Sequence, residues 1–355
     1  MRLRARIYLA IRRPVLAAAG ACLPKRGVPA GRFESLLAVS PDRIGDVILA
    51  TPAFKALADS SPGSRLTVVV REPLVEMLAP QPYISRVLPA GSPGIVSLLR
   101  RERFDVAVDF CCDHRLGSAI LARRSGAGCV VGYEDSGRGA LLDVAGAKPK
   151  EPLHIRDLLL GALGPLAAEP DRALPELCIS PSAAQRVRDL LGGDPAHLVG
   201  IHPGGFYPTQ RWRPERFGEL ARALSERFGV APLFLGGPGD PRIALSTPGA
   251  RDLSGRLSVA ETAAAISMCG LLVCNNSGPL HVATALRIRT VSTMGPTVAA
   301  RWWPVGERNV VIRKDIPCIG CNRGACPLGT HECMESISVP EMAEACAGLL
   351  GAGAG

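Results

Sequence analysis

The chain has 355 residues and is 47% apolar, but only 4% of it is aromatic. That length can bury a full core and suits two domains of ordinary size. The net charge is +9, yet eight basic residues precede the first acid, Glu34, and leave about +1 for the remainder. A near-neutral body with few aromatic side chains argues against a nucleic-acid groove, so no nucleic acid is expected as a partner.

Residues 1–32 form a basic leader. Its bases are Arg2, Arg4, Arg6, Arg12, Arg13, Lys25, Arg26 and Arg32. In residues 1–26 they alternate with apolar side chains, a basic amphipathic pattern suited to lying on an anionic membrane surface. A solvated leader is one alternative, and a signal peptide ending before Cys22, with a short apolar core, is another. No later segment holds about 20 uninterrupted apolar residues, so no membrane-spanning helix is expected.

Beyond the leader, short Val- and Leu-rich runs alternate with helical patterns. The first series predicts strands at 35–39, 65–70, 105–110 and 129–132, and helices at 45–59 and near 153–163. The second predicts strands at 198–201, 231–235, 271–274 and 290–294, and helices at 214–228, 259–268 and 278–286. The predicted fold class is therefore α/β, with two doubly wound Rossmann-like domains facing a cleft, at residues 33–175 and 176–355.

Two loops of the second series look suited to a phosphate ester. One follows the strand at 198–201 and is basic and aromatic, and the other, Asn-Asn-Ser-Gly-Pro at 275–279, opens a helix. A helix start offers unpaired N–H groups and the positive end of the helix dipole, which together favour an anion. Two such loops in one domain predict a diphosphate site.

Five segments also occur in a particular order along the chain. They are IGDVILATPAFKAL (44–57), HPGGFYPTQRWRPERFGELA (202–221), LFLGGPGD (233–240), DLSGRLSVAETAAAISMCGLLVCNNSGPLHVATAL (252–286) and GPTVAARWWPVG (295–306). These resemble the successive signatures of the family 9 glycosyltransferases, the ADP-heptose:lipopolysaccharide heptosyltransferases. The resemblance runs from about residue 35 to 345. It implies a GT-B fold, an N-terminal acceptor domain, a C-terminal nucleotide-sugar domain, and inverting chemistry without a metal or other cofactor.

Asp46 is the predicted catalytic base. Displacing a nucleoside diphosphate from an anomeric carbon requires a base for the acceptor hydroxyl and positive groups for the leaving diphosphate. Asp46 follows Gly45 where the first strand turns into its helix, and it matches the family's Gly-Asp pair. A helix-capping aspartate is the alternative. No two aspartates lie two apart, so an Asp-x-Asp pair for a divalent metal is absent from the sequence.

The resemblance also implies a set of donor-side residues. They are Thr209, Gln210 and Arg211 in the diphosphate loop, Asn276, Ser277, Gly278 and His281 at the helix start, and Asp240 near the nucleoside. Helix capping, a structural histidine and a turn-forming aspartate are the respective alternatives. Gln210 replaces the family's usual lysine, and Asn276 its usual aspartate. An amide can donate to a phosphate but cannot serve as a base, which puts catalytic strength in question.

On the acceptor side, Asp109, Asp113, His114 and Arg115 follow a strand of the first domain and are candidate acceptor contacts. An ordinary polar loop is the alternative reading of these four residues.

Twelve cysteines occur, and four of them make a Cys-x2-Cys-x4-Cys-x6-Cys run in a Cys-rich loop, 318–333. They are Cys318, Cys321, Cys326 and Cys333. The first pair has metal-ligand spacing, but a second Cys-x-x-Cys is missing, so reduced thiols holding a loop are favoured over a zinc or cluster site and over disulfides. Abundant unpaired cysteine indicates a reducing cytosol.

The sequence thus predicts an inverting, metal-independent glycosyltransferase that moves a heptose from ADP-heptose to a lipopolysaccharide-core or other glycan acceptor. The protein is expected in the cytoplasm, on the inner face of the cytoplasmic membrane, with the leader giving peripheral attachment. A catalytically weak or silent nucleotide-sugar-binding protein and a GT-B nucleotide-sugar epimerase are the alternative functions.

Overall fold

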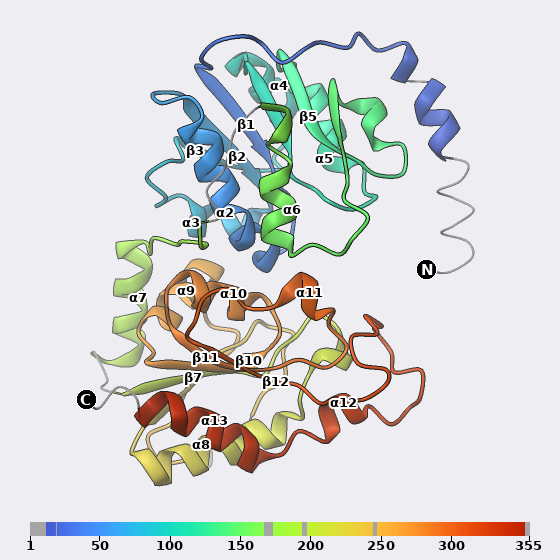
Figure 1. Ribbon diagram of the computed structural model, residues 1–355. Helices are drawn as coiled ribbons and strands as arrows, with labels where there is room; N and C mark the ends of the chain where they lie inside the picture. The colour runs from blue at the N-terminus through green and yellow to red at the C-terminus, as the bar shows by residue number, and fades with distance from the viewer. Residues whose placement is uncertain (1–11, 19, 167–172, 194–196, 244–246, 352–355) are drawn as a thin grey trace. The chain divides into compact units, whose positions relative to one another are not determined.

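The computed structural model describes residues 12–18, 20–166, 173–193, 197–243 and 247–351. The chain divides into two compact units, Met1–Ala173 and Leu174–Gly355, called unit 1 and unit 2 below. In each unit a six-stranded parallel sheet lies between layers of helices (Figure 1). The predicted α/β class with two doubly wound, Rossmann-like domains is confirmed.

The sheet of unit 1 has the strand order β3-β2-β1-β4-β5-β6. Its strands are β1 (Ser35–Val39), β2 (Arg65–Val70), β3 (Arg86–Pro89), β4 (Val106–Asp109), β5 (Cys129–Glu134) and β6 (Val144–Ala147). Helices α2 (Ile44–Asp59) and α6 (Ile155–Gly161) pack together on one face, and α4 (Ile95–Glu102) and α5 (Gly117–Arg124) on the other. The short elements η1 (Glu72–Leu74), α3 (Val75–Leu78), η2 (Arg138–Leu141) and η3 (Gly164–Leu166) complete the unit. The central strand β1 is fully buried, as a near-continuous apolar run predicts for a parallel sheet covered on both faces.

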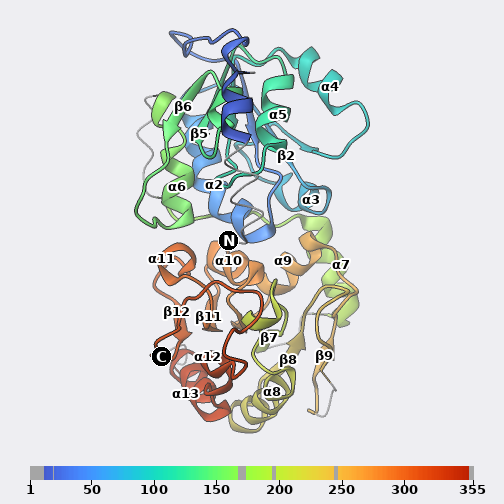
Figure 2. The same cartoon turned by 90° about the vertical axis from the view of Figure 1, so that its right-hand side faces the viewer.

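Unit 2 repeats this topology with the order β12-β11-β10-β7-β8-β9. Its strands are β7 (Leu198–His202), β8 (Ala231–Phe234), β9 (Arg251–Asp252), β10 (Leu271–Asn275), β11 (Arg289–Thr293) and β12 (Asn309–Ile312). Helices α8 (Pro214–Phe228) and α13 (Val339–Gly351) pack side by side on one face, while α7 (Pro181–Leu191), α9 (Val259–Ser267) and α10 (Gly278–Ala285) cover the other (Figure 2). The remaining elements are η4 (Pro208–Gln210), α11 (Ala299–Trp302) and α12 (Glu332–Glu335).

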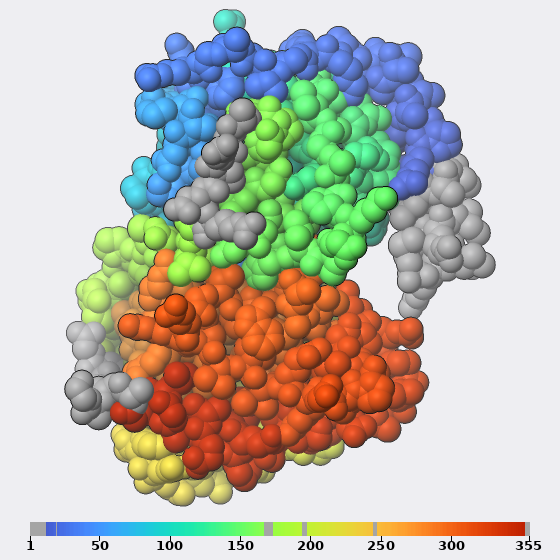
Figure 3. All heavy atoms as spheres, in the orientation of Figure 1, coloured from blue at the N-terminus to red at the C-terminus, as the bar shows by residue number. Residues whose placement is uncertain are grey.

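The described part of the leader lies against unit 1, although most of its residues remain exposed to solvent. Residues 12–18 are helical, and Lys25 Nζ donates to the carbonyls of Gly139 (3.2 Å) and Ala140 (2.9 Å). A Cβ on Gly20 would lie 2.7 Å from that of Ala140, so this close approach requires glycine. Figure 3 shows the dark blue atoms along the outer surface of the unit. The membrane-surface pattern in residues 1–11 lies outside the described residues. Among those described, no helix has the length and apolar content needed to cross a membrane.

Helix α2 contains a proline whose missing N–H is compensated by a neighbouring side chain. Pro52 cannot donate to the carbonyl of Ile48, one turn earlier. Thr51 Oγ1 donates to that carbonyl instead, at 2.8 Å, and both residues are buried. The hydroxyl therefore keeps a buried acceptor satisfied at the centre of the longest helix of unit 1.

We expect Thr51→Val, which keeps the shape but removes the donor, to lower the free energy of unfolding by about 1–3 kcal/mol. The measurement is chemical denaturation of the wild type and the variant. In a Pro52→Ala background the restored N–H serves Ile48, so the cost of Thr51→Val should shrink. An equal cost in both backgrounds would contradict the compensation.

Candidate functional site

The strand order of unit 2 reverses between β7 and β10, and this reversal places the candidate donor residues. At such a switch point the loops leaving two neighbouring strands run to opposite faces of the sheet, and ligands bind in the crevice outside the carboxyl ends. Strand β7 ends at His202 and continues into Pro203, Gly204 and Gly205, whereas β10 ends at Asn275 and leads into α10.

A buried amide joins the two loops. Asn275 Nδ2 donates to the carbonyls of Pro203 (2.8 Å) and Gly204 (3.0 Å). Its Oδ1 accepts from the backbone N–H of Trp212 (2.9 Å) and from Thr293 Oγ1 (2.8 Å). The full hydrogen-bonding capacity of the amide is thereby used, and it fixes the path of the loop after β7 relative to β10 and β11.

The start of α10 remains open to an anion. Ser277 occupies the N-cap position but does not cap the helix, because its hydroxyl donates to the carbonyl of Asn275 at 3.2 Å. Pro279 in the first turn has no N–H to offer. Within the described residues, no protein group accepts from the N–H groups of Ser277 and Gly278. Free N–H groups at a helix start, with the helix dipole behind them, are groups that can bind an anion, and a diphosphate at this position stays a prediction.

Asp240 lies beside the loop that follows β7. Its Oδ2 accepts from the backbone N–H of Gly237 at 2.9 Å and lies 3.5 Å from His202 Nε2, and Arg211 is 3.8 Å from its Oδ1. A Cβ on Gly204 would come within 2.4 Å of the carboxylate, so a larger residue there would displace the Asp240 side chain. Burial lowers the pKa of His202, although the negative charge of Asp240 opposes this effect. The lowered pKa keeps the imidazole neutral near pH 7.

The polar atoms of Thr209 and Gln210 are largely taken up within the protein. Thr209 Oγ1 donates to the carbonyl of Arg323 at 2.7 Å. Gln210 Nε2 donates to Thr297 Oγ1 at 3.2 Å, while its Oε1 accepts from the backbone N–H of Tyr207. Arg211 donates through Nε to the carbonyl of Gly205 at 2.9 Å and keeps its remaining donors beside Asp240. Of these three residues, Arg211 is the one that the geometry equips to meet a diphosphate.

The side chains of Asn276 and His281 lie against α11. Asn276 Nδ2 donates to the carbonyl of Trp302 at 3.0 Å, and the rings of His281 and Trp302 are 6.2 Å apart between centroids. His281 is buried in the second turn of α10. Both residues therefore lie at the same helix start as Ser277 and Gly278, and donor contact by either stays a prediction.

The Cys-rich loop packs beside η4. Cys318, Cys321 and Cys326 are half-buried, Cys333 is buried, and all four are free thiols. A cavity of about 20 Å³ lies among them, with His331 in its lining. His331 Nε2 lies 2.7 Å from the carbonyl of Thr209, so the loop braces η4. Within the described residues no three His, Cys, Asp or Glu side chains are arranged to hold a metal ion, and the thiol state in solution stays a prediction.

The candidate base of unit 1 lies at the corresponding reversal between β1 and β4. Asp46 is in the first turn of α2, half-buried, and accepts a hydrogen bond from the backbone of Arg43, so it does help to cap the helix. Burial, with a smaller contribution from Asp42, raises the pKa of Asp46 to about 6. A carboxyl of this pKa is ionised at neutral pH yet more basic than an ordinary aspartate, as a general base requires.

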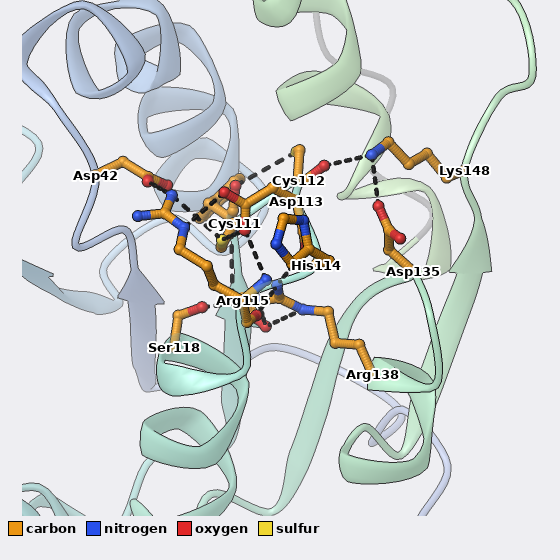
Figure 4. A network of polar contacts seen from close by, with 12 residues as sticks. Asp42, Cys111, Cys112, Asp113, His114, Arg115, Ser118, Asp135, Arg138 and Lys148 are labelled. Carbon is orange, nitrogen blue, oxygen red and sulfur yellow. Dashed lines mark hydrogen bonds and ion pairs between the residues drawn. The ribbon is translucent and has the colours of Figure 1, made fainter. Parts of the chain in front are cut away.

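A chain of charges leads from Asp46 to the loop after β4. Arg115 forms an ion pair with Asp42, and its Nε is 2.6 Å from Asp113 Oδ2 (Figure 4). The backbone N–H of Arg115 also donates to Asp113 Oδ1 at 2.8 Å. The structure thus brings Asp113 and Arg115 to the edge of the sheet that carries Asp46. His114 lies between them in the same loop.

Asp109 occupies a different environment from the other three acceptor-side candidates. It is fully buried and paired with the equally buried Arg138, whose Nε donates to Asp109 Oδ2 at 2.9 Å. Burial raises the pKa of Asp109, and the Arg138 charge opposes that effect. The geometry makes Asp109 an anchor for Arg138, and its predicted contact with an acceptor has no exposed atom to support it.

Sequence reasoning did not single out Asn275, His202 or Arg138. Asn275 and His202 fall within the quoted signatures, and their position directly after a predicted strand was a usable signal. Arg138 lies in a polar stretch after β5 with no motif around it, so nothing in the sequence marked it.

Comparison with known proteins gives a consistent picture. The model of glycosyltransferase family 9 (heptosyltransferase) matches residues 95–331. The chain is similar to lipopolysaccharide heptosyltransferase 1 of Pseudomonas aeruginosa, with 28% identity over 82% of this chain and 87% of that protein. It is also similar to lipooligosaccharide heptosyltransferase 2 of Campylobacter jejuni, with 25% identity over 41% of this chain, and there it spans about half (49%) of the relative's length.

Among solved structures, the ADP-heptose lipopolysaccharide heptosyltransferase II of E. coli superposes with a TM-score of 0.77. The two are 21% identical, and the match covers 90% of this chain and all of the other. At that identity the likeness establishes the fold, and it is the GT-B fold that the sequence resemblance implied.

Asn275→Asp should be among the most damaging single substitutions in unit 2. It replaces the donor to two buried carbonyls with a second acceptor, which leaves a charge facing them. We expect a loss of at least about 3 kcal/mol in the free energy of unfolding, measured by denaturation. Asn276→Asp, one residue along, is the matched control and should cost less, because only one hydrogen bond to Trp302 is lost. Equal effects would contradict the role of Asn275.

Proposed function

Because the chain belongs to glycosyltransferase family 9, the heptosyltransferases, we propose that it transfers a heptose from ADP-heptose to a lipopolysaccharide-core or other glycan acceptor. The observation that carries the proposal is the uncapped start of α10 at the strand reversal of unit 2. Two N–H groups and a helix dipole at that position suit the diphosphate of a nucleotide sugar. The names of the relatives support heptose as the sugar.

On the donor side, the N–H groups of Ser277 and Gly278 would hold the diphosphate. Arg211 would add the positive charge that stabilises the leaving group, in place of a divalent metal. Asp240, on the same loop edge, would accept from a ribose hydroxyl while its other contacts keep it in place. Contacts of Thr209, Gln210 and Asn276 with the donor would be secondary, since hydrogen bonds within unit 2 already engage their side chains. His281, in the second turn of α10, would lie near the sugar or the diphosphate.

On the acceptor side, Asp46 would remove the proton from the attacking hydroxyl. The new bond forms between that oxygen and the anomeric carbon while the bond from this carbon to the diphosphate oxygen breaks, so a single displacement inverts the anomeric centre. Arg115 and Asp113, beside Asp42, are placed to bind a polar acceptor near Asp46.

A silent nucleotide-sugar-binding protein is the second candidate. The supporting observation is that the amides of Gln210 and Asn276, at two positions where the family usually has charged residues, are engaged by Thr297 and Trp302. Gln210 in place of a lysine would then leave one positive charge fewer to stabilise the departing diphosphate, and Asn276 in place of an aspartate could not act as a base. Binding of donor without turnover across a panel of acceptors is the result that would select this function.

Attachment to the inner face of the cytoplasmic membrane rests on the basic amphipathic sequence of residues 1–26 and the net charge of the leader. Cytoplasmic location rests on the abundance of free thiols.

A donor screen tests the function directly. ADP and ADP-sugars should raise the melting temperature in a concentration-dependent way, because a ligand that binds the folded state stabilises it. Asp46→Ala should keep this shift and lose transfer by about 100-fold or more, as expected when a general base is removed. A wild-type protein that ignores ADP but responds to another nucleotide would overturn the donor assignment. Full transfer by Asp46→Ala would overturn the base.

The pKa of Asp46 gives a second test with its own sign. The rate of transfer should rise with pH through about 6, since the base acts only when ionised. The free energy of unfolding should change in the opposite direction. Because the pKa of Asp46 is higher in the folded than in the unfolded protein, ionisation of this group lowers the free energy of unfolding as the pH rises from about 4 to 6. Asp46→Asn should therefore gain on the order of 1 kcal/mol over the wild type above pH 6, after allowing for solvent screening. A constant difference from pH 4 to 8 would exclude the raised pKa.

A further inference from the structure

The loop between β4 and α5 (residues 110–116) has four consecutive carbonyls that accept from cationic side chains. Lys148 Nζ donates to Cys112 O, and Arg138 donates to Asp113 O (2.9 Å) and to Arg115 O (2.6 Å). The carbonyl between these two, that of His114, accepts from Arg12. Figure 4 shows Arg138 and Lys148 converging on this loop. Its backbone path is thus set by charges from three separate parts of the chain.

Two of these cations are themselves held by carboxylates. Arg138 is paired with the buried Asp109, and Lys148 Nζ is 2.7 Å from Asp135 Oδ2. Asp135 belongs to the turn after β5, residues 135–137, whose backbone carbonyls also accept hydrogen bonds from Arg12. Charge-assisted hydrogen bonds of this kind are roughly twice as strong as neutral ones, so the loop and the turn are locked to each other.

Arg12 connects that turn to the loop from the leader. Its Nε and Nη2 donate to the carbonyl of Ser136 at 3.0 and 2.8 Å, while Nη1 serves His114. The Arg12 side chain is only 8% exposed. Its bond to His114 joins two residues that are 102 positions apart in the sequence. Ser136 has a φ of +57°, a left-handed conformation that costs a non-glycine residue energy and persists only when its surroundings enforce it. The two hydrogen bonds from the Arg12 guanidinium to the Ser136 carbonyl help to hold this conformation.

The leader reaches this position through close packing rather than by a charge contact alone. Gly137, at φ +89°, lies so near the leader helix that a Cβ there would be 3.2 Å from the Cα of Arg13. Arg13 itself points its side chain to solvent. The neighbouring residues 12 and 13 therefore differ in one respect that an experiment can use: the first guanidinium is buried in the turn, and the second is exposed.

We propose that Arg12 is a positioning residue for acceptor recognition, which makes the leader a working part of unit 1. By holding His114 O and Ser136 O together, Arg12 sets the loop that presents Asp113 and Arg115 beside Asp42. The inference rests on the proposed function for the identity of the acceptor. The contacts of Arg12 with the carbonyls of His114 and Ser136, called the Arg12 clamp below, are present in the protein without substrate. Without Arg12 the loop should loosen, while the donor residues of unit 2 stay as they are.

The clamp is tested first without any substrate. Amide hydrogen exchange is measured by mass spectrometry on peptides covering residues 110–118 and 133–141 of the full chain. Arg12→Gln should exchange about tenfold faster there than the wild type, the equivalent of one charge-assisted hydrogen bond. Arg12→Lys, which keeps the charge but not the fork, should fall between them. Arg13→Gln, the matched control, should exchange as the wild type does, and identical exchange in all four proteins would overturn the clamp.

Kinetics then separate positioning from general stability. In Arg12→Gln the KM for the glycan acceptor should rise about tenfold, with the KM for ADP-heptose and the melting shift given by ADP unchanged. A proportional rise in both KM values, or a fall in kcat alone, would overturn a role in acceptor recognition even where exchange has changed. If the wild type turns over no ADP-heptose, the proposed function fails separately, and the exchange result still decides whether Arg12 holds the loop.

Discussion

One buried amide, that of Asn275, fixes the geometry on which unit 2 depends. The loop after β7 contains consecutive glycines and so has little conformational preference of its own. The Asn275 side chain donates hydrogen bonds to the carbonyls of Pro203 and Gly204 and accepts from Trp212 and Thr293, and these four bonds determine the path of the loop. Once that path is set, Asp240 and Arg211 take their places beside it, and the start of α10 is left open. The open helix start, where we propose that the diphosphate binds, is therefore a consequence of satisfying buried polar groups at a strand reversal.

Unit 1 solves the same problem with a different side chain at the corresponding position. Asp109 ends β4 as Asn275 ends β10, each strand neighbours the first strand of its own sheet, and both residues are fully buried. Asn275 reaches loop carbonyls directly, whereas Asp109 does so through Arg138, which donates to Asp113 O and Arg115 O. An amide has both donors and acceptors, but a carboxylate has acceptors alone, so it needs a cation as intermediary. The two halves share a topology and differ in the chemistry that holds their loops.

The sequence predicted the central strands of both sheets well because they are buried on both faces and read as continuous Val and Leu runs. β1, β2, β7 and β10 fall within a residue of the expected ranges. The edge strands β3, β6, β9 and β12 were not predicted, since they are short and partly exposed, so tertiary pairing rather than residue type defines them. Helix α13 was also missed, because its Ala- and Gly-rich end resembles a tail. The signatures drew attention to Asp46 and the start of α10, but Asn275 was overlooked although it lies in the same signature. Arg12 and Arg138 act through contacts across more than twenty residues that no local pattern encodes.

The docking of the leader changes how its charge is to be counted. Arg12 binds main-chain carbonyls in the interior of unit 1, and Lys25 and Arg26 bind carbonyls at its surface. A base engaged in this way contributes less to attraction by anionic lipid, which is worth about 1 kcal/mol for each free lysine or arginine near a bilayer. The formal +9 therefore overstates the electrostatic adhesion available to the protein.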